Sequence, residues 1–462
     1  MKEKVAYSAD YDSTVVEKQA DEIDSYNLIN ELSFCVMDLE TTGGDHNYDK
    51  IIEIGLIKIV KLEIVEELSY LIKPGIHIPE FIQKLTSISE NDLLDAPLIE
   101  DVLDRILKFI GDSILVAHNS SFDIPFFNSI LKRAKYPTLN NPAICTNLMT
   151  KYLIPEIMNS NLTYIGELFG IEHKKAHRAL EDAKVAAKVL INYLQFFIEK
   201  KIKKVNHLYY PRKKYELDSI HVQRQKNDNT IEVINKISKI DIPLLITIKG
   251  EKGVILDVLP ISNPPAELDM ISTKLKSIDW NVISLKIAGS FFKVLLFYNS
   301  SICRINNSDA KAWMINYLNY KYLKDFDQNN VKEDKFFDKY FLLTNHLVKD
   351  QFVIYSLSSL FSKNELIFRY PSHQKKLMYF VNFKNKNNNK NEKEKSVKIA
   401  LDNSLKAFFY GYLSRMFVDN YDKDYVFISS ELVNKRVKEF KGIVAKFTTN
   451  SKNTFNYPQK HI

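Results

Sequence analysis

Cysteine is nearly absent from this chain, and so are the long apolar runs of membrane proteins. Cys35, Cys145 and Cys303 are the only cysteines among 462 residues, which is too few and too scattered for a disulfide framework or a zinc cluster. No run of about 18 uninterrupted apolar residues predicts a membrane-spanning helix. The segment from Met1 to Lys4 lacks the apolar region of a secretion signal. We therefore expect a cytoplasmic protein with no membrane partner.

The motifs of nucleotide-binding loops are also missing. The sequence contains neither a P-loop nor a G-x-G-x-x-G stretch, and it has no long internal repeat. After residue 200 no motif of a second enzyme occurs, and a polymerase active site would need more chain and more carboxylates. The 45% hydrophobic content can still build sizeable cores, and the length predicts two or three domains.

Charge is divided unevenly along the chain. Residues 1–30 carry 3 basic and 7 acidic side chains, and residues 31–198 carry 16 and 23. Residues 199–462 carry 45 basic and 27 acidic side chains, so the second part of the chain is strongly basic although the net charge of the whole chain is only +7. A carboxylate metal site would make the first part acidic, and a region that holds nucleic acid would be basic. The alternative is that the lysines only keep the surface soluble.

Four carboxylates and one histidine lie in three separated segments of the first 182 residues. They are Asp38, Glu40, Asp123, His177 and Asp182. Hydrolysis of a phosphodiester by two divalent metals requires several carboxylates that converge from different elements. Mg²⁺ prefers oxygen ligands of this kind. The set therefore predicts a metal-dependent phosphodiesterase site.

The first two segments each follow an apolar run that reads as a buried strand. Asp38 and Glu40 are two residues apart at the end of the run 34–37, so their side chains share one face. Asp123 falls in the first turn of a helix expected from 122 after the strand 113–116. Taken alone, each has a plain alternative: an exposed strand end for the pair, and complementing the helix dipole for Asp123.

The third segment leads into a long helix expected over residues 179–198. Asp182 lies near the start of this helix, and a loop position for His177 leaves its imidazole free to reach the site. Histidine suits a general base because its ordinary pKa lies near working pH. One apolar face at three- and four-residue spacing predicts how the helix packs: Ala183, Ala186, Ala187, Leu190, Tyr193 and Phe197.

Together the three segments resemble the DnaQ-like (DEDDh) family of 3′→5′ exonucleases, which has a ribonuclease H-like fold. Residues 38–43 match D-x-E-T-T-G, residues 118–123 match H-N-x-x-F-D, and residues 177–182 match H-x-A-x-x-D. Two lesser stretches, 85–88 and 145–148, also look like the family. The resemblance covers about residues 31–198 and leaves the C-terminal region unrecognised.

The resemblance implies a role for each matching residue. Asp38, Glu40, Asp123 and Asp182 would hold two divalent metal ions, Mg²⁺ or Mn²⁺, and His177 would be the general base. The substrate would be contacted by a further set of residues: Thr41, Leu85, Thr86, Asn119 and Phe122.

The implied activity is removal of nucleoside 5′-monophosphates from the 3′ end of a nucleic acid. Single-stranded DNA is favoured over RNA, in proofreading or repair, because residues 38–43 and 85–88 look most like polymerase-associated members. A DNA polymerase or repair complex is a possible partner. Two alternatives stay open: an exoribonuclease that trims RNA 3′ ends, and a non-catalytic protein that binds nucleic-acid ends or acts as a scaffold.

The expected fold class is α/β, with a ribonuclease H-like mixed sheet flanked by helices over residues 31–198. Strands are expected at 33–38, 51–60 and 64–72, and helices near 98–110, 122–133, 146–153 and 162–169. An acidic flexible tail is expected over 1–30, and a basic linker over 199–240. The tyrosines and lysines that are interleaved in this linker could bind nucleic acid, or the linker could be a solvated connection.

An unrecognised α+β region is expected to follow. We expect a small α+β domain over 241–330, with a hairpin at 244–261, strands at 281–287 and 291–298, and a helix at 309–323 with Trp313 in the core. Residues 331–462 are expected to form an aromatic-rich α+β region. In it, the Asn/Lys tract near 384–395 is predicted to be disordered, and a helix is predicted near 397–418.

Overall fold

The computed structural model describes nine stretches of the chain, and it divides the chain into two compact units, residues 1–217 and 218–462. The described stretches are 29–154, 156–199, 217–225, 229–305, 307–332, 334–359, 365–388, 403–419 and 424–450. The expected acidic tail and most of the basic linker lie outside them. Among the described residues, no helix is long and apolar enough to cross a membrane.

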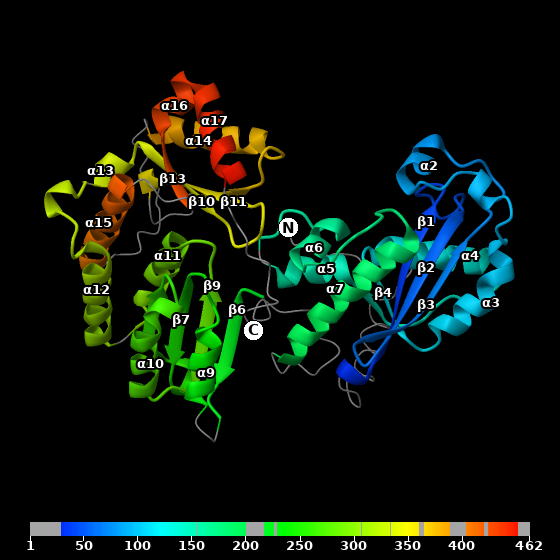
Figure 1. The fold of residues 1–462 in the computed structure, drawn as a ribbon, viewed down its shortest axis with the longest axis horizontal. Helices are drawn as coiled ribbons and strands as arrows, with labels where there is room; N and C mark the ends of the chain where they lie inside the picture. The colour runs from blue at the N-terminus through cyan, green and yellow to red at the C-terminus, as the bar shows by residue number, and fades with distance from the viewer. Residues whose placement is uncertain are drawn as a thin grey trace. The chain divides into compact units, whose positions relative to one another are not determined.

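A five-stranded mixed sheet forms the centre of the first unit (Figure 1). Strands β1, β2 and β3 are antiparallel to one another, whereas β4 and β5 run parallel to β1. In spatial order the strands are β3 (Glu63–Leu71), β2 (Ile51–Val60), β1 (Ser33–Thr41), β4 (Ile114–Ala117) and β5 (Ala143–Cys145). The expected strands are therefore confirmed, and β1 runs three residues beyond its expected end.

Helices cover both faces of this sheet, as the α/β prediction requires. They are α2 (Glu80–Thr86), α3 (Ile99–Ile110), α4 (Ser120–Arg133), α5 (Thr146–Leu153), α6 (Leu162–Leu168) and α7 (Ala179–Glu199), with short 3-10 turns η1 (Ile29–Glu31) and η2 (Asn91–Leu93). Cys35, Met37 and Leu39 share a core with residues of α3 and α4. The alternate residues of β1 face the other way, where α7 packs across β1 and β2.

Helix α7 has the apolar face that its sequence predicts. Its six predicted core residues, from Ala183 to Phe197, are all buried. The alanines let the helix axis come close to the sheet, and the Tyr193 hydroxyl lies 2.6 Å from the Thr150 hydroxyl of α5. This packing fixes where the first turn of α7 lies over the sheet.

The second unit contains two four-stranded antiparallel sheets. One has the order β6-β9-β7-β8, and the other β12-β11-β10-β13. Their strands are β6 (Ser219–Gln223), β7 (Leu244–Lys249), β8 (Ile255–Ile261), β9 (Val282–Ile287), β10 (Tyr340–Asn345), β11 (Phe352–Ser356), β12 (Glu365–Phe368) and β13 (Tyr425–Ser429). The expected hairpin is confirmed by the antiparallel pairing of β7 with β8.

The helices of the second unit lie between and beside these sheets. They are α9 (Thr230–Ile237), α10 (Leu268–Ser277), α11 (Phe291–Ile302), α12 (Ser308–Leu323), α13 (Asp334–Phe337), α14 (Gln374–Asn388), α15 (Asn403–Asp419), α16 (Ser430–Lys435) and α17 (Val437–Asn450). Residues of α14, α16 and α17 share a core with one face of the second sheet. Short 3-10 turns are η4 (Glu251–Gly253), η5 (Pro265–Glu267), η6 (Gln328–Asn330) and η7 (Leu357–Ser359).

Four expectations for the second unit differ from the structure. Residues 291–298, expected as a strand, belong to helix α11, whose start is capped by the Ser290 hydroxyl accepting from the Lys293 amide. A short, continuous apolar run does not distinguish a buried strand from a buried helix. Trp313, expected in the core, is 42% exposed on α12.

The other two differences concern segments expected to lack regular structure. The predicted linker 199–240 contains strand β6 and helix α9, and β6 pairs with β9 along its whole length. Residues 384–388, in the tract predicted to be disordered, form the end of α14. The rest of that tract lies outside the described stretches, as do the first residues of the helix expected near 397–418.

Candidate active site

The first pair of carboxylates projects from the end of β1. Asp38 pairs across the sheet with Gly55 of β2, and Glu40 pairs with Glu53. Cross-strand partners share a face of the sheet, so three carboxylates and one glycine lie next to one another there. The absence of a side chain at Gly55 leaves space on this face.

The first turn of α7 fills the space over Gly55. A Cβ atom added at Gly55 would lie 2.4 Å from the backbone of Ala179 and Leu180, so the helix backbone rests directly on the strand. Asp182 follows one turn later. This close approach is what brings Asp182 to the same face as Asp38 and Glu40.

Asp123 reaches the site from the opposite layer. It lies in the first turn of α4, which follows β4 at the end of that strand, and it is 4% exposed. The charge of its carboxylate acts on those of Asp38 and Glu40, so the three carboxylates lie in one cluster.

His177 lies in the loop just before α7, as predicted from the sequence. Its side chain is exposed, and its φ of 63° is in the left-handed region that residues other than glycine rarely adopt. Its amide donates to the Asp182 carboxylate over 3.4 Å. Ligand atoms of Glu40, His177 and Asp182 lie within 4.8 Å of one another. A metal ion could bind to these three side chains.

A second histidine, His173, holds the Asp182 carboxylate from behind. Its Nε2 atom lies 2.6 Å from one Asp182 oxygen, and its Nδ1 atom lies 2.9 Å from the Thr163 hydroxyl of α6. The His173 side chain is only 3% exposed. The contact orients the carboxylate and leaves its other oxygen for the site. No sequence signal predicts this role, because His173 lies outside the three motifs.

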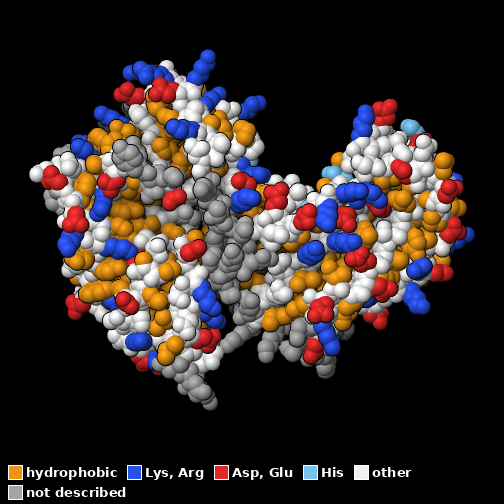
Figure 2. Space-filling view, viewed as in Figure 1, with side chains coloured by type: hydrophobic (Ala, Val, Ile, Leu, Met, Phe, Trp, Pro, Cys, Tyr) orange, Lys and Arg blue, Asp and Glu red, His pale blue; other side chains and the backbone are white. Residues whose placement is uncertain are grey.

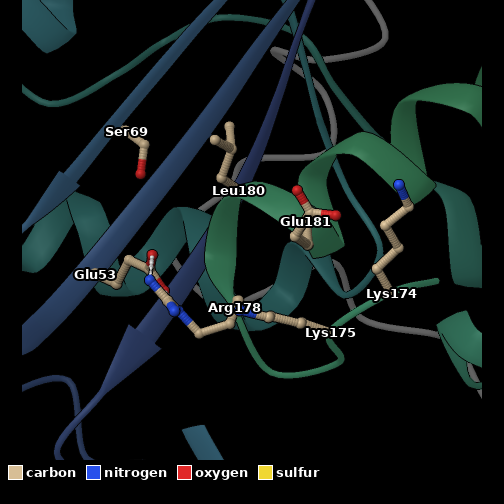
Figure 3. A pocket seen from close by; sticks show the side chains of 7 residues that line it. All are labelled: Glu53, Ser69, Lys174, Lys175, Arg178, Leu180 and Glu181. Atoms are coloured by element: carbon tan, nitrogen blue, oxygen red, sulfur yellow. Dashed lines mark hydrogen bonds and ion pairs between the residues drawn. The ribbon is translucent and has the colours of Figure 1, made fainter. Parts of the chain in front are cut away.

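Glu53 and Arg178 form a second support for the same loop. The Arg178 guanidinium donates to both oxygens of Glu53 at 2.9 and 3.0 Å, and the Ala179 amide donates to Glu53 at 3.0 Å (Figure 3). Glu53 is 3% exposed, so its charge is neutralised inside the fold. Glu53 thereby holds Arg178, the last residue of the loop, and Ala179, the first residue of α7. Both follow His177 directly. A lone acid in the apolar run of β2 was the available sequence signal.

A cavity of about 330 Å³ opens beside this ion pair (Figure 3). Its walls come from β2, β3, the start of α7 and the loop before it, and they comprise Glu53, Ser69, Lys174, Lys175, Arg178, Leu180 and Glu181. Asp38, Glu40, Asp123 and Asp182 are not among them. The cavity therefore flanks the carboxylate cluster without containing it.

The expected substrate contacts differ in how accessible they are. Asn119 and Leu85 are exposed, and Phe122 is half-buried. Leu85 belongs to α2, whose residue Ile82 packs with Ile52 at the start of β2, and this is the end of the sheet where the carboxylates lie. Leu85 is therefore suitably placed for a substrate contact.

Two threonines of that expected set are buried. The Thr86 hydroxyl donates to the Ile82 carbonyl and accepts from the Ile88 amide, so it closes the end of its own helix. Its position supports a structural role instead of a nucleotide contact. The Thr41 hydroxyl donates to the Gly43 carbonyl and shapes the turn after β1. Any contact from Thr41 to a nucleotide would therefore come from the backbone of this turn.

His118 of the second motif also has a supporting place. Its two ring nitrogens lie 3.0 Å from the Thr146 hydroxyl and 2.8 Å from the Ser160 carbonyl. Burial lowers the pKa of its imidazole, which keeps the ring neutral. His118 thus fastens the loop that precedes Asn119 and α4.

Burial of the carboxylates, with their mutual repulsion, raises their proton affinity. Burial, followed by repulsion from Asp123 and Asp182, raises the pKa of Asp38 well above its usual range. Burial and the charge of Asp182 raise the pKa of Glu40 to about 8. Burial raises the pKa of Asp123 to about 7 although two amides oppose it, and burial also raises the pKa of Asp182 although His173 opposes it.

This donor set fits divalent cations. Four carboxylates repel one another when all are ionised, and within the described residues the nearby Arg178 already neutralises Glu53. Hard oxygen ligands of this number and charge suit Mg²⁺ or Mn²⁺. A cation bound among the four carboxylates would stabilise their ionised forms and so displace the protons that their raised pKa values favour.

Comparison with known proteins gives matches to the first unit. The sequence profile described as exonuclease matches residues 35–190. DNA polymerase III subunit epsilon from Aquifex aeolicus is 37% identical over 163 residues, which cover 35% of this chain and 81% of that protein. The 3′-5′ exonuclease DinG from Staphylococcus epidermidis is 34% identical over 190 residues, or 41% of this chain and 21% of that protein.

Other relatives are much longer than this chain. The PolC-type DNA polymerase III from Caldanaerobacter subterraneus is 35% identical over 224 residues, which are 48% of this chain and only 15% of that protein. Among solved structures, exonuclease X in complex with 5′ overhanging duplex DNA is 27% identical, with a TM-score of 0.29, over 34% of this chain and 89% of that one.

Proposed function

Since the chain belongs to the DnaQ-like (DEDDh) exonuclease family through residues 35–190, we propose that it is a metal-dependent 3′→5′ exonuclease. The observation that carries the proposal is the convergence of Asp38, Glu40, Asp123 and Asp182, with His177 exposed at the rim. A protein that had kept the fold for binding alone would not need all five. The expected product is a nucleoside 5′-monophosphate.

The carboxylates have the role of holding two divalent ions against the substrate phosphate. Asp38, Glu40 and Asp182 would hold one ion, and Asp38 and Asp123 the other. Bound ions supply polarisation of the phosphate and stabilisation of the developing charge on the leaving oxygen. Asp182 is fixed by its contacts with His173 and the His177 amide before any ion arrives, which lowers the cost of forming the site.

His177 is the proposed general base. Its side chain is exposed beside Glu40 and Asp182, so its imidazole can take a proton from the attacking water and pass it to solvent. The amide contact to Asp182 and the neighbouring Arg178–Glu53 ion pair hold the backbone on which the imidazole pivots. The backbone is thereby held while the imidazole stays exposed to solvent.

DNA is the substrate that we favour, with a role in proofreading or repair and a DNA polymerase or repair complex as partner. The support is the match to a DNA polymerase III subunit and to PolC-type polymerases. An RNA-trimming enzyme is the second candidate, because the proposed chemistry acts on the phosphodiester and not on the sugar 2′ position.

Degradation of 5′-labelled single strands tests the activity, its polarity and its sugar preference together. DNA and RNA of one sequence are incubated with the intact chain and Mg²⁺, Mn²⁺ or a chelator. A ladder that shortens from the 3′ end, disappears with chelator and is absent for Asp182→Asn supports the proposal. The matched control is Glu181→Gln, an acid beside it that has no role in the proposed site. A folded protein that degrades neither strand with either metal would overturn the proposal.

A further inference from the structure

Helix α14 presents one buried face and one exposed face. Leu377 and Val381 belong to the core of the sheet β12-β11-β10-β13, and the Asn385 amide group donates to the Ser430 carbonyl at the start of α16. These contacts hold the helix to its layer. The opposite face is thereby turned to solvent as a rigid surface.

The exposed face carries two large aromatic rings side by side. Tyr379 is 74% exposed and Phe383 47% exposed. Their ring centroids are 6.3 Å apart and their planes differ by 16°, so the two flat faces lie nearly parallel. One turn before them Lys375 and Lys376 are exposed, and the spacing of three and four residues puts all four side chains on one stripe. We call these four residues the α14 stripe.

The surroundings of the α14 stripe are strongly basic. Helix α14 contains four lysines and no acid, and residues 430–450, which include α16 and α17, contain five basic side chains and two acids. Both acids pair locally, Glu431 with Lys435 and Glu439 with Arg436. Among the described residues no acid pairs with Lys375 or Lys376. Lysine and arginine side chains gather over these helices in Figure 2.

Another exposed aromatic group lacks this charge pattern. On α12, Trp313 stacks on Tyr317, but the lysine over Trp313 is Lys274, which pairs with the buried carboxylate of Asp257 at 3.0 Å. The Tyr317 hydroxyl donates to Glu267. The charge of Lys274 is therefore neutralised by Asp257 of the same protein, whereas the lysines of the α14 stripe can pair with the negative charge of a partner.

We propose that the α14 stripe binds single-stranded nucleic acid, with bases stacking on Tyr379 and Phe383 and phosphates on Lys375 and Lys376. Unpaired bases offer flat faces to aromatic rings, and their backbone offers regularly spaced negative charge. Duplex bases are already stacked on one another, so a single strand is the form that fits. The proposal rests on the proposed nuclease function, for which the stripe would be a second hold on the substrate strand.

The first test is binding of the intact chain to a labelled oligothymidylate of about 30 nucleotides, with chelator present to prevent cleavage. Replacing both rings, in Tyr379→Ala with Phe383→Ala, should weaken binding about tenfold or more, as removal of stacking partners does elsewhere. An abasic strand of the same length should bind equally well to the parent and the variant. The matched control, Tyr320→Ala, removes a ring 64% exposed on α12 and should leave binding unchanged.

The second test separates the lysines from the rings. Lys375→Gln with Lys376→Gln should lower the slope of log affinity against log salt by roughly 1.4, because each phosphate contact on a single strand contributes about 0.7. The conservative Tyr379→Trp should keep full binding. Unchanged affinity and salt slope in folded variants would overturn the proposal, and would leave the stripe as a surface for a protein.

Cleavage of a dinucleotide distinguishes this proposal from the proposed function. A dinucleotide that occupies the carboxylate site has no further nucleotides to offer to a second surface. Ring variants should therefore cleave dinucleotides at the parent rate and long strands with a higher KM. If the folded parent cleaves neither dinucleotides nor long strands, the exonuclease proposal fails, while the binding measurements still decide on the stripe.

Discussion

At the residue scale, the site depends on side chains that the motifs do not include. His173 is outside all three motifs, yet it is buried with one nitrogen 2.6 Å from Asp182. Glu53 of β2 fixes the backbone beside His177 by accepting from the Arg178 side chain and the Ala179 amide. The motif residues were predictable because their chemistry needs acids at those spacings. The supporting residues were not, because only the folded loop brings them next to the acids.

Replacing His173 should impair metal binding more than folding. His173→Ala frees the Asp182 carboxylate to rotate, and loss of such outer contacts elsewhere weakens metal affinity about 10- to 100-fold. His173→Gln, which can still donate to Asp182, should recover much of the loss. Mn²⁺ affinity measured by calorimetry, with Lys174→Ala as the control in the same loop, checks this. Equal affinities for all four proteins would contradict the positioning role.

The raised carboxyl pKa values give the metal-free protein a definite pH dependence. Folding raises the pKa of Glu40 from 4.5 to about 8 and the pKa of Asp123 from 3.8 to about 7. At a pH between the unfolded and the folded value of each group, the folded state therefore binds more protons than the unfolded state. Their contribution therefore destabilises the fold increasingly as pH rises from about 4 to about 8. With chelator the melting temperature should fall by a few degrees across this range.

Divalent ions should cancel that fall, because they bind the ionised carboxylates. The rise in melting temperature on adding Mg²⁺ should be largest at the upper end of the pH range. The double variant Asp38→Asn with Glu40→Gln should lose the response to Mg²⁺ and the part of the pH dependence that comes from Glu40, while the part from Asp123 remains. A melting temperature that rises with pH in chelator would contradict the crowding of these carboxylates.

At the element scale, one glycine determines how α7 meets the sheet. A methyl group at Gly55 would lie 2.4 Å from the backbone of α7, so Gly55→Ala must push the first turn of the helix away. We expect a loss of about 1–3 kcal/mol in the free energy of unfolding. Activity should fall further than stability, because Asp182 moves with the turn. Gly44→Ala, which has open space around it, is the control, and an unaffected Gly55→Ala would show that α7 packs differently.

Element types were predictable where periodicity was long and one-sided. Helix α7 has its six predicted apolar positions in the core, and β1 to β3 are close to their expected bounds. The run 291–298 was wrongly predicted as a strand, because consecutive Phe, Leu and Val residues suit a buried helix as well as a strand. Ser290, which caps the start of α11, was the sequence signal for a helix. Strand β6 was hidden in a charged segment because its pairing with β9 is made by backbone groups, which are common to all residues.

At the scale of the whole molecule, the two units differ in charge. Residues 1–217 carry 26 basic and 32 acidic side chains, a net charge of −6, and residues 218–462 carry 38 and 25, a net charge of +13. The second unit is therefore the part suited to attract a polyanion, and the sequence alone predicted this division. What the sequence could not predict is where the charge lies, because that depends on which faces of α14, α16 and α17 are buried.

Removal of the second unit should uncouple catalysis from strand binding. A fragment of residues 1–217 should still cleave dinucleotides, since every proposed catalytic residue lies within it. It should bind long single strands more weakly and with a smaller salt slope than the intact chain. Filter binding at several salt concentrations gives both quantities, and an identical salt slope for fragment and intact chain would contradict a strand-binding role for the second unit.

Metal binding to the intact chain tests the central claim most directly. Calorimetric titration with Mn²⁺ in the presence of a nucleoside 5′-monophosphate should show two ions per chain. Asp38→Asn, which removes the carboxylate assigned to both ions, should stay folded and lose both. If the parent protein binds no Mn²⁺, or if Asp38→Asn binds it with unchanged affinity, the carboxylate cluster is not the metal site and the proposed mechanism is wrong.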